Sequence, residues 1–253
     1  MKKNYTNEAG VIILDILEKK IQAKQEQKEQ YITIFKILGS LYEENTYVLI
    51  KEEKEEKEAI VIDPGVYDNS LVEFLKENNI EVRYVILTHL HVDHIIGLNN
   101  ITKEFKDAKV IISKEELKHM YDSEYTLYNG EYNVLEDNII TVLNGEKQEE
   151  QQKEKEQEEK GIEEERKIED NTILGMNVRY ILTPGHTKGG MCILLDNILF
   201  TGDTLFKGSY GRFDLKGGNY MEMVSSLNYL RKLDRDILVL AGHGDNTIIG
   251  EEA

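Results

Sequence analysis

Short apolar runs rich in Val, Ile and Leu recur along the chain, and each is bounded by polar or turn-forming residues. Runs of this length and composition are typical of buried strands. Between several of them, apolar positions recur every three or four residues, which predicts amphipathic helices. The predicted strands are residues 31–38, 46–50, 59–63, 84–87, 109–112, 176–182, 191–195, 198–201 and 237–240, and the predicted helices are residues 69–78, 93–105, 114–121 and 220–233.

These elements form two successive groups, one before and one after a polar segment at residues 146–170. Two sheets that pack face to face, with helices outside, are the layered architecture that suits this order. The sequence therefore predicts an α+β fold of two mixed sheets in one domain that spans residues 31–253.

The polar segment at residues 146–170 is low-complexity Glu, Lys and Gln, with twelve acidic and six basic residues. Such a segment cannot bury enough apolar surface to offset its chain entropy. We predict a solvated surface insert, and we expect that its removal leaves the chemistry intact.

Residues 1–30 stand apart as an N-terminal extension that ends in a polar stretch. Ile13, Leu14, Leu17 and Ile21 fall at helical spacing, which is compatible with a short amphipathic helix. The alternative is a solvated extension without a role in the chemistry, and the composition favours it.

The charge and the cysteine content narrow the class of protein. The net charge is −17, from 31 Lys and Arg against 48 Asp and Glu, which argues against a nucleic-acid partner because phosphate binding requires a basic surface. The single cysteine, Cys192, allows no internal disulfide, and its apolar surroundings predict a buried core residue. With no signal-peptide pattern and no apolar stretch near the ~20 residues of a membrane span, the sequence predicts a cytoplasmic protein.

Four metal-ligating side chains follow the apolar run at residues 84–87: His89, His91, Asp93 and His94. Three of the six histidines of the chain fall in this segment, which makes a purely structural role improbable because clustered imidazoles repel once they are protonated. In an extended segment His89 and His91 face the same way and can reach one ion. A helical turn at Asp93 and His94 would direct these two toward a second position, so the motif predicts two neighbouring metal ions.

Three further strand ends carry candidate ligands, namely His186, Asp203 and His243, each with a glycine beside it in the sequence. Glycine permits a close backbone approach. Each of these is weak evidence alone, but together with the first motif they account for five of six histidines. The remaining one, His119, we interpret as structural or surface-exposed.

The whole set resembles the metallo-β-lactamase superfamily, whose hallmark is a His-x-His-x-Asp-His motif followed by three separate ligand turns. The match covers about residues 31–253 and includes an Asp-Pro-Gly turn at residues 63–65. Residues 183–187, 201–206 and 211–215 look like the glyoxalase II-like (hydroxyacylglutathione hydrolase) branch, in its short single-domain form. Long members carry an additional C-terminal helical segment that binds glutathione, and we expect this chain to lack it.

The resemblance implies a four-layer αβ/βα sandwich and a binuclear metal site. One metal would be held by His89, His91 and His186, and the other by Asp93, His94 and His243, with Asp203 as the bridge. Zinc suits these N and O ligands, and iron or manganese is compatible with them.

The implied reaction is hydrolysis of an S-2-hydroxyacylglutathione to a hydroxy acid and glutathione, with a metal-bridging hydroxide as nucleophile. Asp203 and Asp93 are the catalytic candidates, the latter as a ligand first and a proton acceptor second. An anionic small-molecule thioester would need local cations, so Arg212, Lys188 and Tyr210 are the predicted substrate contacts, followed by Lys207 and Tyr220. For each lysine a solvated surface position is the favoured alternative, and Arg212 has the alternative of bracing Asp214.

Three other functions share these residues. A persulfide dioxygenase uses one iron held by two histidines and a carboxylate, and a lactonase or a nuclease uses the same scaffold. The acidic charge argues against the nuclease. A non-catalytic metal-binding or interaction module is disfavoured because the ligand set is complete.

Overall fold

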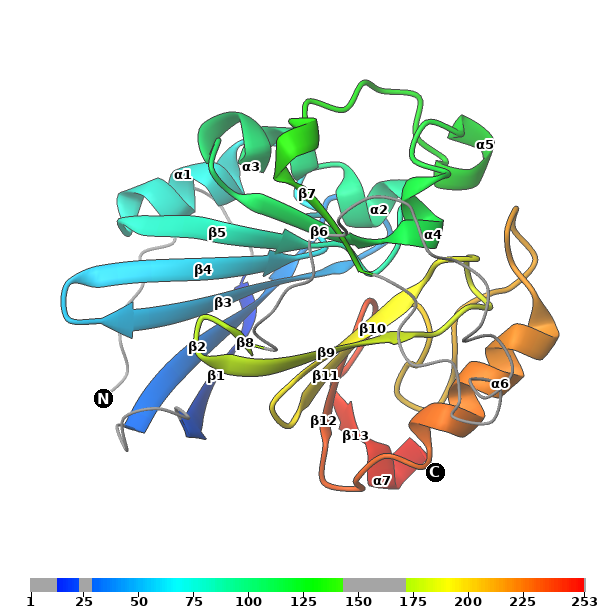
Figure 1. The fold of residues 1–253 in the computed structure, drawn as a ribbon. Coiled ribbons are helices and arrows are strands. Elements are labelled where there is room, and N and C mark those ends of the chain that lie inside the picture. The colour runs from blue at the N-terminus through cyan, green and yellow to red at the C-terminus, as the bar shows by residue number, and fades with distance from the viewer. Residues whose placement is uncertain (1–12, 23–28, 143–171, 253) are drawn as a thin grey trace, which may run out of the picture.

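Two sheets lie face to face in the computed structural model, and helices cover the outer side of each (Figure 1). This arrangement confirms the predicted α+β fold with two mixed sheets. The structure describes residues 13–22, 29–142 and 172–252.

The first sheet has seven strands in chain order. Its first four strands pair antiparallel and its last four pair parallel. The strands are β1 (Ile13–Gln22), β2 (Glu29–Leu38), β3 (Asn45–Glu53), β4 (Glu56–Ile62), β5 (Ile80–Ile86), β6 (Lys109–Ser113) and β7 (Ile139–Val142).

The second sheet has six strands in the order β13-β12-β11-β10-β9-β8. Only the β11–β12 pair is parallel. The strands are β8 (Thr172–Ile173), β9 (Met176–Leu182), β10 (Met191–Leu195), β11 (Ile198–Gly202), β12 (Leu238–Ala241) and β13 (Thr247–Ile248).

Helices cover the two outer faces unequally (Figure 1). Five lie over the first sheet and two over the second. The first set is α1 (Ser70–Glu77), α2 (Val92–Ile95), α3 (Leu98–Glu104), α4 (Lys114–Leu117) and α5 (Ser123–Thr126), the second is α6 (Tyr220–Leu230) and α7 (Ile249–Glu252), and one 3-10 turn, η1 (Glu136–Asn138), precedes β7. None of these helices combines the length and the apolar composition that a bilayer span requires.

The core has three parts, which explains why the strands read as continuous apolar runs. Phe35 of β2 packs among the helices over the first sheet, whereas its neighbour Ile34 faces the second sheet. A strand covered on both faces buries consecutive residues, because successive side chains point to opposite sides. The third part lies under α6 and contains Cys192, which is fully buried, so its predicted core position is confirmed.

The short helix that was the less favoured alternative for the N-terminal extension is not observed at residues 13–22. Residues Ile13–Gln22 form β1, which pairs antiparallel with β2 at the edge of the first sheet. An available sheet edge supplies a ladder of backbone hydrogen bonds, and this tertiary gain outweighs a weak helical periodicity. The division of the chain at residue 30 stays a prediction.

Several other boundaries differ from the prediction. Gly97 divides the helix expected at residues 93–105 into α2 and α3, where a Cβ would lie 2.3 Å from the Val66 carbonyl oxygen. The helix expected at residues 114–121 ends at Leu117. The insert at residues 146–170 lies outside the described residues.

Candidate metal centre

The structure brings all seven predicted ligand residues together where the two sheets meet. His89 and His91 follow β5, and Asp93 and His94 lie on α2. The other three follow strands of the second sheet: His186 follows β9, Asp203 follows β11 and His243 follows β12. Because β11 and β12 are parallel, their carboxyl ends lie side by side, which places Asp203 beside His243.

The seven residues form two groups of three around Asp203. In the first group, His89, His91 and His186, the potential ligand atoms lie within 4.8 Å of one another, and all three residues are buried. The second group is Asp93, His94 and His243, with the same limit on its ligand atoms. Its His243 side chain is 24% exposed, so this group is the more open one.

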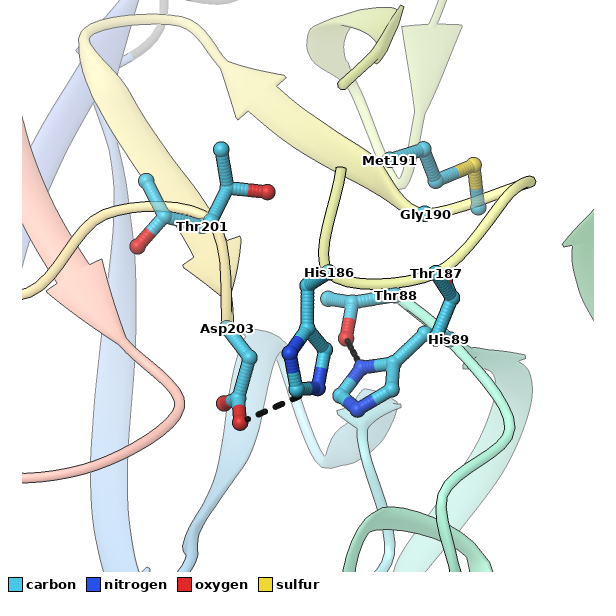
Figure 2. Close-up of a pocket in the computed structure, with 9 residues that line it drawn as sticks. Thr88, His89, His186, Thr187, Gly190, Met191, Thr201 and Asp203 are labelled. Atoms are coloured by element: carbon cyan, nitrogen blue, oxygen red, sulfur yellow. Dashed lines mark hydrogen bonds and ion pairs between the residues drawn. The ribbon is translucent and has the colours of Figure 1, made fainter. Parts of the chain in front are cut away.

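Asp203 contacts both groups. Its Oδ2 lies 3.4 Å from His186 Nε2, and its Oδ1 lies 3.3 Å from His94 Nε2 and 3.6 Å from His243 Nε2. The two oxygens therefore point to different groups, which is the geometry that a bridging carboxylate requires. Figure 2 shows the Asp203 carboxylate beside the ring of His186, with the ring of His89 on the far side of His186.

Hydrogen bonds at Nδ1 fix the orientation of four rings. His94 Nδ1 lies 3.0 Å from Asp63 Oδ2, and His186 Nδ1 lies 2.6 Å from the Arg212 carbonyl oxygen. His243 Nδ1 lies 3.1 Å from the Tyr42 carbonyl oxygen, and His89 Nδ1 lies 3.0 Å from Thr88 Oγ1, whose hydroxyl donates to Asp63. Each acceptor draws the ring proton to Nδ1, so each Nε2 presents a lone pair to the cluster.

The donor set fits divalent metal ions. Buried atoms without a hydrogen-bond partner include His89 Nε2, His94 Nε2 and Asp203 Oδ1, all of which face the cluster. His91 Nδ1 lies only 2.8 Å from His186 Nε2, and two nitrogen lone pairs at this distance repel unless a proton or a cation lies between them. A buried cation at each group would satisfy these atoms.

The pKa values of the first group keep its rings neutral. Burial, followed by the charges of neighbouring imidazoles, lowers the pKa of His91 to about 3 and that of His89 well below its ordinary value. Burial likewise lowers the pKa of His186. Burial alone would raise the pKa of Asp203, but the electrostatic attraction of the surrounding imidazoles, that of His94 first, outweighs it and lowers that pKa. Neutral imidazoles and an ionised carboxylate are the protonation states that bind a metal.

Asp63 is a functional residue that the sequence indicated only as part of a turn. Its Oδ1 accepts from the Thr88 backbone N–H at 2.7 Å, and its Oδ2 accepts from the Thr88 hydroxyl at 2.6 Å and from His94. A third combination of Asp63, His89 and His94 could in principle hold an ion, but these hydrogen bonds already use the Asp63 oxygens and both Nδ1 atoms. Asp63 therefore orients ligands rather than binding a metal.

Glu44 is a second carboxylate that the sequence analysis missed. It is fully buried, with Oε1 3.9 Å from His94 Nδ1 and Oε2 accepting from the Thr46 hydroxyl at 2.9 Å. Burial raises its pKa well above the ordinary value. Nothing in the local sequence separates Glu44 from the exposed Glu43, because the distinction comes from its contacts.

The predicted substrate contacts lie near the cluster but at its surface. The Arg212 guanidinium forms two 2.8 Å hydrogen bonds to Asp214 and holds the pKa of that carboxyl at about 2, which is the bracing alternative. The Lys188 side chain is exposed, and Tyr210 is 46% exposed. Substrate contact by these three residues stays a prediction.

One small hollow lies within the cluster, and a larger groove lies near it. The first, of about 10 Å³, is lined by residues that include His89, His186 and Asp203, and it has room for roughly one water centre (Figure 2). The other is an open groove of about 640 Å³ whose lining includes Gly244, the residue after His243. Lys36 and Lys207 also line it, together with the acidic residues Glu43 and Asp245. Binding sites for drug-sized ligands have volumes in this range.

Several known proteins resemble this chain in sequence or in fold. A probable metallo-hydrolase of Methanocaldococcus jannaschii is 33% identical over 218 residues, which cover 84% of this chain and 93% of that relative. The hydroxyacylglutathione hydrolase GloC of Haemophilus influenzae is 30% identical over 201 residues, covering 78% of this chain and 85% of GloC. The crystal structure of the BLEG-1 B3 metallo-beta-lactamase matches with a TM-score of 0.66 at 26% identity, covering 87% of this chain and 95% of BLEG-1.

The model of one family matches residues 41–243, which is most of the chain. That span contains all seven residues of the cluster. The chain therefore belongs to the metallo-beta-lactamase superfamily, whose members bind divalent metal ions.

Proposed function

We propose that the protein is a binuclear metal hydrolase that cleaves thioesters of the S-2-hydroxyacylglutathione type. The observation that carries the proposal is the pair of three-residue groups that share Asp203. His89, His91 and His186 would hold one ion, and Asp93, His94 and His243 would hold the other. The similarity to GloC supports the choice of a glutathione thioester.

Two divalent ions held at these positions would lower the pKa of a bound water toward 7 and would polarise the scissile carbonyl. Around them, Asp203 sets the spacing of the two groups through its two oxygens. Asp93, whose Oδ2 lies 3.3 Å from His243 Nε2, would receive the proton that the attacking water loses. The leaving group is a thiolate, and because the pKa of its conjugate thiol is about 8.5, no general acid is required to protonate it.

We further propose that the groove beside His243 receives the acyl-glutathione. The segment from Phe206 to Arg212 borders both metal groups: the Phe206 ring lies edge-on to His243 at 5.8 Å, and the Arg212 carbonyl holds His186. Lys207 of this segment lines the groove. Tyr210, Arg212 and Lys188 are not among the residues that line the groove, and we propose that they contact the anionic part of the substrate outside it.

The decisive experiment measures metal content and activity on one sample. Protein purified without chelator is analysed for metals and assayed with S-lactoylglutathione. We expect about two metals per chain and thioester cleavage that disappears on chelation. One iron per chain, with oxygen uptake on glutathione persulfide and no hydrolysis, would instead identify a dioxygenase.

A further inference from the structure

Glu116 is a buried carboxylate whose contacts the proposed reaction does not use. It lies on α4 with none of its surface exposed. Ser113 caps α4 and accepts a hydrogen bond from the Glu116 backbone N–H at 3.0 Å. The Glu116 side chain accepts four hydrogen bonds from other segments.

The two carboxylate oxygens reach two different ligand loops. Oε1 accepts from the backbone N–H of Leu90 at 3.0 Å, and Leu90 lies between His89 and His91. Oε2 accepts from the Thr187 hydroxyl at 3.1 Å and from the Gly189 backbone N–H at 2.9 Å, both just after His186. One side chain thus bonds to both loops that carry the three-histidine group.

The surrounding contacts fix Glu116 in this position. Tyr125 of α5 donates from its hydroxyl to Oε2 at 2.8 Å, and the same hydroxyl accepts from the Lys188 N–H at 3.0 Å. Ser113 donates to the Gly189 carbonyl at 2.5 Å. A Cβ on Gly189 would lie 2.2 Å from the Glu116 nitrogen, so glycine is required for this close approach.

The second group is oriented by other residues. His94 Nδ1 bonds to Asp63, and His243 Nδ1 bonds to the Tyr42 carbonyl. None of the four hydrogen bonds to the Glu116 carboxylate comes from the loops around His94 or His243. A substitution of Glu116 should therefore affect the three-histidine group and leave the group of Asp93, His94 and His243 unchanged.

We propose that Glu116 is a positioning residue that holds the His89–His91 loop and the His186 loop at the separation that one metal ion requires. The inference rests on the proposed function only in that the three histidines bind a metal. It concerns the affinity of that group and requires no particular substrate. A buried carboxylate with two backbone N–H donors, one on each oxygen, resists displacement because both donors would lose their partner.

The test is Glu116→Gln, which keeps the size of the side chain. Whichever way the amide is oriented, its NH2 group faces a backbone N–H, that of Leu90 or that of Gly189, so one loop loses its acceptor. Zinc affinity is measured by competition with a chromophoric chelator in two backgrounds. His243→Ala disables the second group and reports on the three-histidine group, and His186→Ala does the reverse.

We expect Glu116→Gln to weaken zinc binding about 10- to 100-fold in the His243→Ala background. In the His186→Ala background we expect a change within about twofold, because His94 and His243 are oriented by Asp63 and the Tyr42 carbonyl and not by Glu116. Glu115→Gln is the matched control, since Glu115 is the neighbouring residue on α4 and its side chain pairs with Lys118 at the surface. It should leave both affinities unchanged.

Tyr125→Phe provides a second variant, because it removes one of the four donors and keeps the ring. We expect a weakening of a few-fold, again confined to the three-histidine group. Equal losses in both backgrounds, or none in either, would overturn the inference. Two zinc ions in the wild type without thioester cleavage would contradict the proposed function and leave this inference intact, whereas thioester cleavage with unchanged Glu116→Gln affinities would do the opposite.

Discussion

The two sheets supply the metal centre in different ways. The first sheet contributes four ligand candidates from one short segment after β5, His89 to His94. The second contributes His186, Asp203 and His243 from three separate strand ends. The first set can be arranged by local backbone geometry, whereas the second depends on strand pairing, such as the register that sets Gly202 opposite Ala241.

The effect of a substitution on the centre should depend on whether the residue contacts one of the two groups or both. Each group of three contains residues from both sheets, so neither sheet alone provides a complete site. Asp203 is the residue of the second sheet that contacts both groups. Substitution of Asp203 should therefore impair both groups, whereas substitution of a residue that orients a single histidine ring should impair only one.

The largest effect is expected for Asp203→Ala. We expect hydrolytic activity to be abolished and at least one metal per chain to be lost, because both groups lose a shared oxygen ligand. Elemental analysis and the S-lactoylglutathione assay measure the two effects. Asp107→Ala, at an exposed position in the first half of the chain, is the control and should behave as the wild type. An Asp203→Ala protein with two metals and normal turnover would refute the ligand assignment.

The same contrast explains what the sequence could predict. The run at residues 84–87 and the motif after it are local, so periodicity and ligand spacing were enough to place them. Strands β2 to β6 of the first sheet are covered on both faces, and their apolar runs predicted them, β5 only from residue 84 onward. Strand β7 was not predicted. β1 was missed because an edge strand takes its conformation from its neighbour β2 rather than from its own periodicity.

Asp63 and Glu116 escaped prediction for a related reason. The hydrogen bonds of Asp63 go to residues 25 and 31 positions away, and those of Glu116 go to residues as far as 73 positions away. No pattern in the neighbouring sequence encodes such contacts. An acidic residue at the end of a predicted strand, as Asp63 is in the strand predicted at residues 59–63, was the available signal.

A smaller loss of metal affinity is expected for Asp63→Asn, because Asp63 contacts ligand-bearing segments of the first sheet only. The amide NH2 cannot accept the hydrogen bonds that one carboxylate oxygen now accepts from Thr88 or His94. We expect metal affinity to fall about 10- to 100-fold, with His94 the ligand most disturbed. Chelator competition measures the loss, and Asp107→Asn is the matched control. Unchanged affinity would show that the backbone alone orients His94.

A still smaller effect is expected for Arg212→Ala. The side chain is exposed and pairs with Asp214, while the backbone carbonyl that holds His186 remains in the variant. We expect KM to rise about two- to fivefold, as for the loss of one exposed charge contact, with kcat and metal content unchanged. Lys103→Ala, at an exposed position on α3, is the control. An unchanged KM would leave Arg212 with the structural role alone.

The smallest effect is expected for the segment at residues 146–170, which connects the two halves between β7 and β8. If the halves are brought together by their packed faces, the identity of this connection matters little, because loop-closure entropy changes slowly with length. We expect turnover within about threefold after replacement of the segment by a Gly/Ser sequence of equal length, and likewise after a shorter Gly/Ser linker. The equal-length variant is the control, because it keeps the length of the connection and changes only its sequence. A loss in the short variant alone would indicate a linker too short to span the strand ends, whereas a loss in both would assign the segment a direct part in binding or catalysis.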